Sequence, residues 1–197
     1  FRTRVLIDGI DISDPSSPQV APRMEHILAG SLERVEILRG TQGLLWGADA
    51  GGVIALTSRR GNEGVSFDIS AERGGYGFET ESAVASTGRM SFGELTAVLN
   101  RVEMEGFNAL RSDTQLADSD GYDNDSFQLS YRTPEWNGWS ATLSTREVDA
   151  DAEYDSCGRF DENFSFISSN ECSDGYKNKT QGMVVRHLGE GYSTQLG

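Results

Sequence analysis

Carboxylate side chains in two acidic stretches are the groups of this chain best suited to binding a metal ion. The first stretch comprises Asp113, Asp118, Asp120, Asp123 and Asp125, and the second comprises Glu147, Asp149, Asp151, Glu153 and Asp155. The second set recurs at every other position, so an extended chain projects it from one face. Hard cations such as Ca²⁺ take about six to eight oxygen ligands. We predict a calcium site formed by Asp118, Asp120, Asp123, Asp125, Asp149 and Asp151, with an ordinary solvated acidic surface as the alternative.

No catalytic group of residues emerges from the sequence. Residues 74–77 read GGYG, which fits a hairpin tip better than a nucleotide-binding loop because no helical pattern follows. The nucleophile motif G-x-S-x-G is absent, and nothing singles out two carboxylates as a glycosidase pair. His26 lies in a short helical segment and is expected to be structural. We therefore predict no enzyme and no catalytic cofactor.

Composition limits the classes of partner. The chain has 17 basic and 31 acidic residues, a net charge of −14 and a mean hydropathy of −0.45. Recognition of phosphates needs clustered Lys and Arg, so nucleic acid is not an expected partner. No run approaches the roughly 18 apolar residues of a membrane helix. Membrane strands stay possible, because about 9 to 11 residues of alternating apolar and polar type can cross a bilayer.

Strand-like alternation dominates the sequence after residue 64. Strands are predicted at residues 65–73, 78–87, 92–105, 126–133, 139–147, 179–188 and from Tyr192 onward. Short connections alternate with long ones, and the long ones are residues 106–125 and 148–178. This alternation is typical of outer-membrane barrels, whose long loops lie outside the cell. A soluble β-sandwich has no reason to confine its long loops to one end.

A glycine-rich segment near the beginning carries a family resemblance. Residues 5–10 (VLIDGI), 35–40 (VEILRG), 46–47 (WG) and 51–54 (GGVI) follow one another in order. These motifs resemble the C-terminal part of the plug domain of TonB-dependent outer-membrane receptors. The plug motif is carried by Arg39, Gly40, Gly47, Gly51 and Gly52. Departures from the usual pattern leave the subfamily open, and they are Thr41, Trp46 and Ala55.

The resemblance implies a mainly β fold in two parts and a role in transport. Residues 1–61 would be the C-terminal part of a plug domain, and residues 62–197 would be about seven antiparallel strands of an incomplete transmembrane β-barrel. We expect an internal fragment of a receptor that imports a scarce nutrient across the bacterial outer membrane. Its implied partners are outer-membrane lipid and the TonB energy-coupling protein, which would act through a segment missing here. The plug's upper loop would bind the nutrient through Ser13, Asp14, Ser16, Ser17 and Gln19, and a plain surface loop is equally compatible.

A narrower resemblance concerns the ligand. Residues 105–110 (EGFNAL) and 118–124 (DSDGYDN), with the later acidic hairpin, look like the corresponding part of vitamin B12 (cobalamin) receptors. In those receptors acidic residues of extracellular loops bind calcium and order the loops for substrate, which favours the calcium site described above. Cobalamin is therefore the leading ligand. Ferric-siderophore receptors share the plug motifs equally well, and carbohydrate receptors share most of them.

The two cysteines fit an envelope protein. Cys157 and Cys172 are the only cysteines of the chain. The bacterial envelope is oxidising, and an even count in an exported chain favours a bridge. We predict a disulfide between them, with a pair of free buried thiols as the alternative. Zinc is not indicated, since His26 and His187 lie far from both cysteines in the sequence.

A different class of function stays open beside transport. A soluble or surface-displayed β-rich binding module would use the acidic loops for adhesion, and Phe67, Leu129 and Leu143 would then not face lipid. Dependence on detergent for solubility would favour the barrel, and a monodisperse detergent-free monomer would favour the module.

Overall fold

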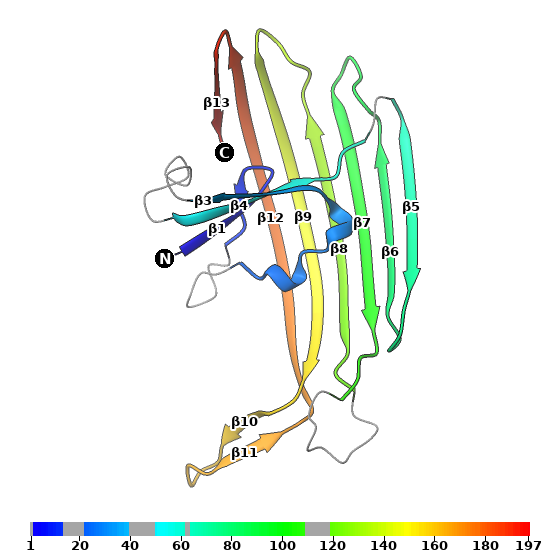
Figure 1. Cartoon of the computed structure of the whole chain (residues 1–197), viewed down its shortest axis with the longest axis vertical. Coiled ribbons are helices and arrows are strands. Elements are labelled where there is room, and N and C mark those ends of the chain that lie inside the picture. Colours follow the sequence, from blue (N-terminus) through cyan, green and yellow to red (C-terminus); the bar gives the residue numbers. More distant parts are fainter. Residues whose placement is uncertain (1, 14–21, 40–49, 62–63, 109–118) are drawn as a thin grey trace.

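The computed structural model describes residues 2–13, 22–39, 50–61, 64–108 and 119–197. It contains a four-stranded sheet, a seven-stranded sheet and a separate two-stranded hairpin (Figure 1). Within these ranges no helix is long and apolar enough to cross a membrane.

The four-stranded sheet, called the small sheet below, has the strand order β2-β1-β4-β3. Its strands are β1 (Arg2–Ile7), β2 (Ile10–Asp11), β3 (Leu32–Arg39) and β4 (Ala50–Ser58). β1 pairs with β4 in parallel, and the other neighbours are antiparallel. Two short 3₁₀ helices, η1 (Met24–His26) and η2 (Ala29–Ser31), lie between β2 and β3 in the sequence. Buried Val5, Ile7 and Leu56 form the core of this unit.

The seven-stranded sheet, called the wall sheet below, is antiparallel throughout and has the order β13-β12-β9-β8-β7-β6-β5. Its strands are β5 (Ser66–Arg73), β6 (Glu79–Ser86), β7 (Glu94–Met104), β8 (Tyr122–Arg132), β9 (Trp139–Tyr154), β12 (Cys172–Gly189) and β13 (Tyr192–Leu196). The hairpin consists of β10 (Cys157–Phe160) and β11 (Phe166–Ser169) and lies between β9 and β12 in the sequence.

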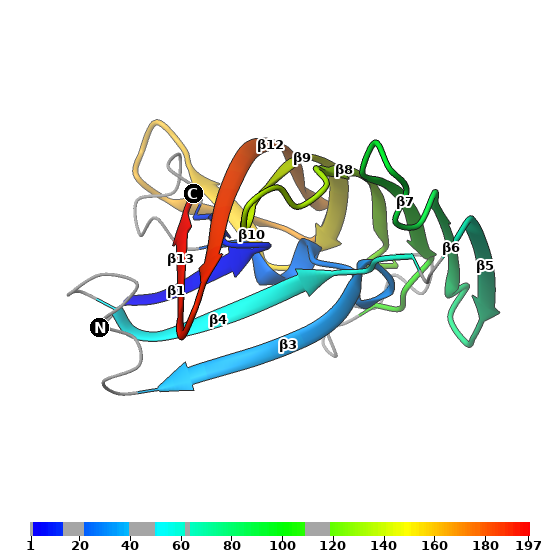
Figure 2. The same cartoon turned by 90° about the horizontal axis from the view of Figure 1, so that it is seen from above.

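The small sheet lies across the middle of one face of the wall sheet (Figures 1 and 2). Side chains alternate across the wall, and neighbouring residues differ sharply: Val98 is 1% exposed and Leu99 is 54% exposed. Buried Val84, Val98 and Val148 share the inner face, which the small sheet covers, whereas Ile69, Leu99 and Leu143 lie on the open outer face. An exposed apolar face of this kind is what membrane strands present to lipid.

The wall strands reach further than the sequence predicted. β8 begins at Tyr122 instead of Ser126, β9 ends at Tyr154 instead of Glu147, and β12 begins at Cys172 instead of Lys179. The predicted long loops at residues 106–125 and 148–178 were therefore wrong in extent. The ends of β8 and β12 were missed because polar side chains lie on both faces there, so hydropathy no longer alternates. In β9, residues 148–152 do alternate, with Val148 and Ala150 buried, and this end was missed because its carboxylates were assigned to a loop.

Connections at the two ends of the wall differ in length, as predicted. β6–β7, β8–β9 and β12–β13 are joined by short links at the upper end of Figure 1. β7–β8 and β9–β12 are joined at the lower end by longer segments, one of which contains the β10–β11 hairpin. The shorter 74–78 link also lies at that lower end, and its residues Tyr76 and Gly77 have positive φ, consistent with the predicted hairpin tip.

Candidate functional site

The segment Arg23–His26 makes a polar contact with three strands of the wall sheet. Arg23 forms an ion pair with Asp174 of β12, with its Nη1 2.7 Å from Oδ2. The His26 carbonyl oxygen accepts hydrogen bonds from Arg146 of β9 at 3.1 Å and from Asn124 of β8 at 3.4 Å. We call this group the His26 contact, and its members are Arg23, Glu25, His26, Tyr122, Asn124, Arg146, Asp174 and Tyr176.

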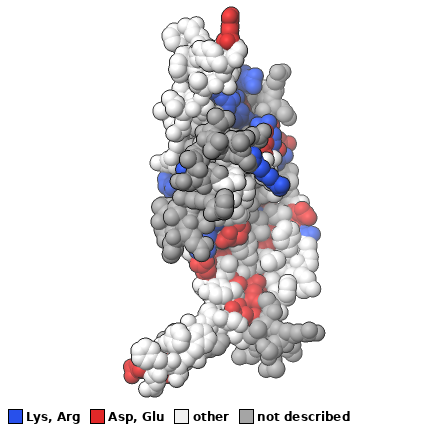
Figure 3. Space-filling view, turned by 60° about the vertical axis from the view of Figure 1, so that its left-hand side comes forward, with Lys and Arg blue, Asp and Glu red and all other residues white. Residues whose placement is uncertain are grey.

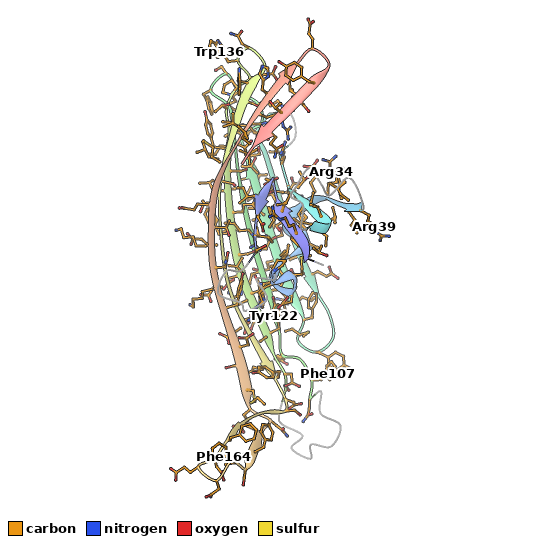
Figure 4. The ribbon with its side chains drawn as sticks, turned by 90° about the vertical axis from the view of Figure 1, so that its left-hand side faces the viewer. Arg34, Arg39, Phe107, Tyr122, Trp136 and Phe164 are labelled. Carbon is orange, nitrogen blue, oxygen red and sulfur yellow. A yellow bond between two sulfur atoms is a disulfide. The ribbon has the colours of Figure 1, made fainter. Side chains whose placement is uncertain are left out.

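Two aromatic rings enclose His26. Its imidazole stacks on Tyr176 with centroids 4.6 Å apart, and it lies parallel to Tyr122 with centroids 6.0 Å apart. Arg23 also lies over the Tyr176 ring, with its guanidinium carbon 5.6 Å from the centroid. Figure 4 shows Tyr122 on the side of the wall that faces the small sheet. His26 is only 3% exposed as a result.

The hydrogen bonds around Tyr122 assign the proton of the imidazole. The Tyr122 hydroxyl lies 3.2 Å from the Glu25 carbonyl oxygen, 2.8 Å from Asn124 Nδ2 and 3.1 Å from His26 Nδ1. A carbonyl oxygen can only accept, so the single hydroxyl proton goes to Glu25. All three bonds then form when His26 Nδ1 carries the ring proton. This leaves Nε2 as an unprotonated nitrogen, buried and without a hydrogen-bond partner among the described residues.

Burial sets the charge state of His26. Removal from water is the largest influence and lowers the pKa of His26 from its ordinary value of 6.5. Glu25 and Asp174 oppose this shift, whereas Arg23 and Arg146 add to it. The imidazole is therefore held in its neutral form near pH 7.

A second polar contact joins the small sheet to the wall near the short-link end. Asp8, whose φ is 52°, accepts from the Ser58 backbone amide at 3.1 Å and also from the Ser58 hydroxyl. Gln128 of β8 donates to Ser58 Oγ at 2.5 Å and to Asp8 Oδ2 at 3.5 Å. Ser58 and Gln128 are both buried. β8 therefore contacts the first 61 residues at two separate points, through His26 and through Asp8 with Ser58.

Basic side chains gather between the small sheet and the wall. A cavity of about 720 Å³ is lined by Arg59, Arg60, Arg89 and Arg132, with Glu33, Asp68 and Glu94 among them. On the face in Figure 3, Lys and Arg gather mainly in the upper half, nearer the short links, and Asp and Glu are more frequent below. On this face, basic and acidic side chains are therefore unevenly distributed between the two ends of the wall.

The predicted calcium ligands lie mainly on β8 and β9. Asp123 lies opposite Asp151, and Asp125 lies opposite Asp149 in the paired strands. These residues share the outer face with Phe127. Asp120 lies just before β8, and Asp118 falls outside the described residues. Across the described part of the chain, no group of three or more His, Cys, Asp or Glu side chains is arranged to hold a metal ion.

Lysines of β12 neutralise part of this acidic surface. Lys177 Nζ lies 2.7 Å from Asp149 Oδ2, and Lys179 pairs with Glu147. Arg101 of β7 lies 3.2 Å from Glu103 and 3.9 Å from Asp125. Each of these groups is largely exposed, so each pair contributes little to stability.

Cys157 and Cys172 are joined by a disulfide, as predicted. Their Cα atoms are 6.2 Å apart, and the bridge closes the base of the β10–β11 hairpin. Asp161 orders the tip, because its Oδ1 accepts from the amides of Asn163 and Ser165, each at 2.8 Å. Phe164, labelled in Figure 4, is 86% exposed at this tip.

The remaining predicted residues divide between described and undescribed positions. Arg39 ends β3, on the side of the small sheet away from the wall in Figure 4, and Gly51 and Gly52 lie within β4. Gly52 allows close approach of the two backbones, since an added Cβ would lie 3.3 Å from the Leu38 carbonyl oxygen. Ser13 donates to Asp11 Oδ1 from its amide and its hydroxyl. Six of these predicted positions lie outside the described residues, namely Asp14, Ser16, Ser17, Gln19, Gly40 and Gly47.

Sequence reasoning missed the wall residues of the His26 contact. Had the predicted strand begun at Tyr122 instead of residue 126, its alternation would have placed Tyr122 and Asn124 on the face opposite to that of Asp123 and Asp125. Nothing in the sequence indicates that Arg146 and Asp174 meet a segment more than a hundred residues earlier.

Three comparisons with known proteins agree with this geometry. Residues 1–54 match the family described as the TonB-dependent receptor plug domain. The chain is 30% identical over 170 residues to the vitamin B12 transporter BtuB of Vibrio vulnificus (strain CMCP6), an alignment that covers 83% of this chain and 27% of that protein. The chain therefore spans about a quarter of the length of this curated relative.

Solved structures share the fold. The ferripyoverdine receptor of the outer membrane of Pseudomonas aeruginosa superposes with a TM-score of 0.64 at 16% identity, covering 93% of this chain and 25% of the receptor. The copper transporter OprC gives a TM-score of 0.69 at 14% identity, covering 94% of this chain and 26% of that protein. At these identities the likeness concerns the fold alone.

Proposed function

We propose, from the premise that this chain is part of a TonB-dependent receptor with a plug domain, that the whole protein imports a scarce nutrient across the bacterial outer membrane. The chain is an outer-membrane protein, and the small sheet is part of its plug. We place the boundary between plug and barrel at residues 61 and 62, between the end of β4 at Ser58 and the start of β5 at Ser66. Transport and not catalysis is the proposed activity.

Cobalamin is the ligand we propose. The observation that carries this choice is the 30% identity to a vitamin B12 transporter, which extends over most of this chain and includes the wall as well as the plug. A ferric siderophore or a carbohydrate is the alternative within the same family. The likeness to the ferripyoverdine receptor is in fold and does not favour its ligand.

The proposed route places selectivity at the long-link end and energy coupling at the opposite end. The ligand would meet the loop that contains Ser13, Asp14, Ser16, Ser17 and Gln19 together with the extracellular links. TonB would act on a part of the plug outside this chain and rearrange the plug so that the ligand enters the periplasm. The outer face of the wall, with exposed Ile69 and Leu99, would contact lipid.

Calcium is part of the proposal, with a limit set by the structure. Asp123 with Asp151 and Asp125 with Asp149 provide two facing carboxylate pairs, and Lys177 already engages Asp149. Ca²⁺ needs about six to eight oxygens. The described carboxylates alone therefore do not make a complete site, and Asp118, Asp120, backbone carbonyls or other loops must supply the rest.

Cobalamin uptake by the full-length receptor tests the proposal. Cells that lack their own cobalamin receptor should accumulate cobalamin when they express this protein and an energised TonB, and deletion of TonB should abolish the gain. Purified receptor should also bind cobalamin directly. Uptake of a ferric siderophore without any binding of cobalamin would contradict the choice of ligand and preserve the transport assignment.

A further inference from the structure

His26 is a titratable group buried at the junction of two structural units. It belongs to the plug part of the chain, and strands β8, β9 and β12 of the wall surround it. Its neighbours with charge or a titratable proton are Arg23 and Glu25 on its own segment, Tyr122 on β8, Arg146 on β9, and Asp174 and Tyr176 on β12. A change in the charge of His26 therefore acts on the contact between plug and wall.

The hydrogen bonds of the neutral ring leave no place for a second proton. Nδ1 already donates to the Tyr122 hydroxyl in the arrangement that satisfies Glu25 and Asn124. A proton on Nε2 would meet no acceptor among the described residues, since Nε2 is buried and unpartnered. The resulting imidazolium would be repelled by Arg23 and Arg146 and attracted by Glu25 and Asp174, and the loss of water around the buried ring outweighs these opposing charges. A buried charge without a partner is unfavourable.

We propose that uptake of a proton by His26 weakens the His26 contact, and with it the attachment of the plug to the wall, so that this attachment depends on pH. Detachment exposes the ring to water, where it can accept a proton freely. The lowered pKa of the attached ring gives the direction: the contact has its full strength above about pH 6.5, and it weakens as the pH falls below that value towards the pKa of the buried ring. This inference concerns the plug and wall alone, so it stands or falls independently of which nutrient is transported.

Hydrogen exchange in the purified full-length receptor tests whether the His26 contact weakens at low pH. Protection factors of the backbone amides of residues 24–31 should fall about tenfold between about pH 7.5 and pH 5.5, after correction for intrinsic exchange. His26→Gln, which keeps a polar side chain and cannot titrate in this range, should show no such fall. The chain contains one other histidine, His187, which lies beside Trp139 and Tyr192 on the wall. His187→Gln is therefore the matched control and should keep the fall seen in the wild type.

A second variant separates a titrating role from a merely structural one. Arg146→Gln keeps a donor for the His26 carbonyl oxygen but removes a cation that lowers the pKa of His26. The pKa of the buried His26 should therefore lie closer to its ordinary value of 6.5. The fall in protection between about pH 7.5 and pH 5.5 should then be smaller than in the wild type. Protection that does not change with pH in the wild type would overturn the proposal, and so would an undiminished fall in His26→Gln.

Discussion

At the scale of single residues, two lysines form ion pairs with carboxylates of the second acidic stretch. The sequence contains no basic residue within the second run of alternating carboxylates, and its periodicity correctly predicts that Asp149 and Asp151 share a face. The register of β9 with β12 then brings Lys177 opposite Asp149 and Lys179 opposite Glu147. Periodicity determines the face of a residue, but the partner comes from strand pairing, which a single sequence does not specify.

Calcium binding is a prediction at this scale. We expect chelation of Ca²⁺ to lower the affinity of the full-length receptor for cobalamin by about tenfold, because Ca²⁺ would neutralise the facing carboxylates of β8 and β9 and order the links next to them before the ligand arrives. Asp151→Asn should reproduce part of this loss, since it removes a carboxylate opposite Asp123. Calorimetric titration with CaCl₂ and with cobalamin measures both affinities.

The control for calcium is a carboxylate at the other end of the wall. Glu135→Gln changes an exposed residue of the β8–β9 link and should leave both affinities unchanged. Linkage requires that cobalamin tighten Ca²⁺ by the same factor as Ca²⁺ tightens cobalamin. Equal cobalamin affinities with and without chelator would remove calcium from the mechanism.

At the scale of elements, the β10–β11 hairpin depends on its disulfide. Cys157 and Cys172 are separated by 15 residues, and closing such a loop stabilises the folded form by about 3 kcal/mol in the chain-entropy estimate. The variant Cys157→Ser with Cys172→Ser should therefore lose about that much local stability. Protease cleavage between residues 157 and 172 at increasing urea concentration measures it.

Thiol chemistry gives an independent check on the bridge. The unreduced wild-type protein should take up no maleimide after denaturation, and Cys157→Ser alone should expose one reactive thiol. Stoichiometric labelling of both cysteines in the unreduced wild type would show that the bridge does not form in the envelope.

Strand existence was predictable, and strand length was not. Residues 65–73 and 139–147 alternate clearly, and β5 and β9 begin where the sequence places them, to within one residue. β12 was predicted only from Lys179 onward because residues 172–178 are polar on both faces. Pairing with β9 extends both strands, since backbone hydrogen bonds between strands do not require apolar side chains.

At the scale of the whole molecule, the ends of the wall define its orientation. The long links should face the outside of the cell and the short links the periplasm. Glu162 lies in the β10–β11 hairpin and Glu190 lies in the β12–β13 link, and both are exposed. Glu162→Cys should react with a membrane-impermeant maleimide on intact cells, whereas Glu190→Cys should react only after the outer membrane is opened. Equal labelling of both on intact cells would contradict this orientation.

The sequence motifs predicted that a plug fragment precedes the wall, but not how the two units meet. The apolar pattern of β1 and β4 gives the core of the small sheet, with Val5 and Leu56 buried. The His26 contact joins residues 96 to 151 positions apart. Such contacts depend on the pairing of β8, β9 and β12, and no local sequence pattern specifies them.

The paired residues on the outer face of the wall sheet form rows across the strands, and the charges in these rows bear on the inclination of the strands to a membrane. One row of paired residues runs from Ile69 through Leu99 and Phe127 to Glu147 and Lys179, and the next runs from Glu81 through Arg101 and Asp125 to Asp149 and Lys177. In the first row only the residues of β9 and β12 are charged, whereas in the second row those of β7 and β8 are charged as well. If the outer face contacts lipid as proposed, the water boundary would cross the strands obliquely, which is expected for strands inclined to the bilayer normal. β9 and β12 would then leave the lipid before β7 and β8 do, and the disulfide-closed hairpin that they carry would lie farthest from the membrane among the elements of this wall.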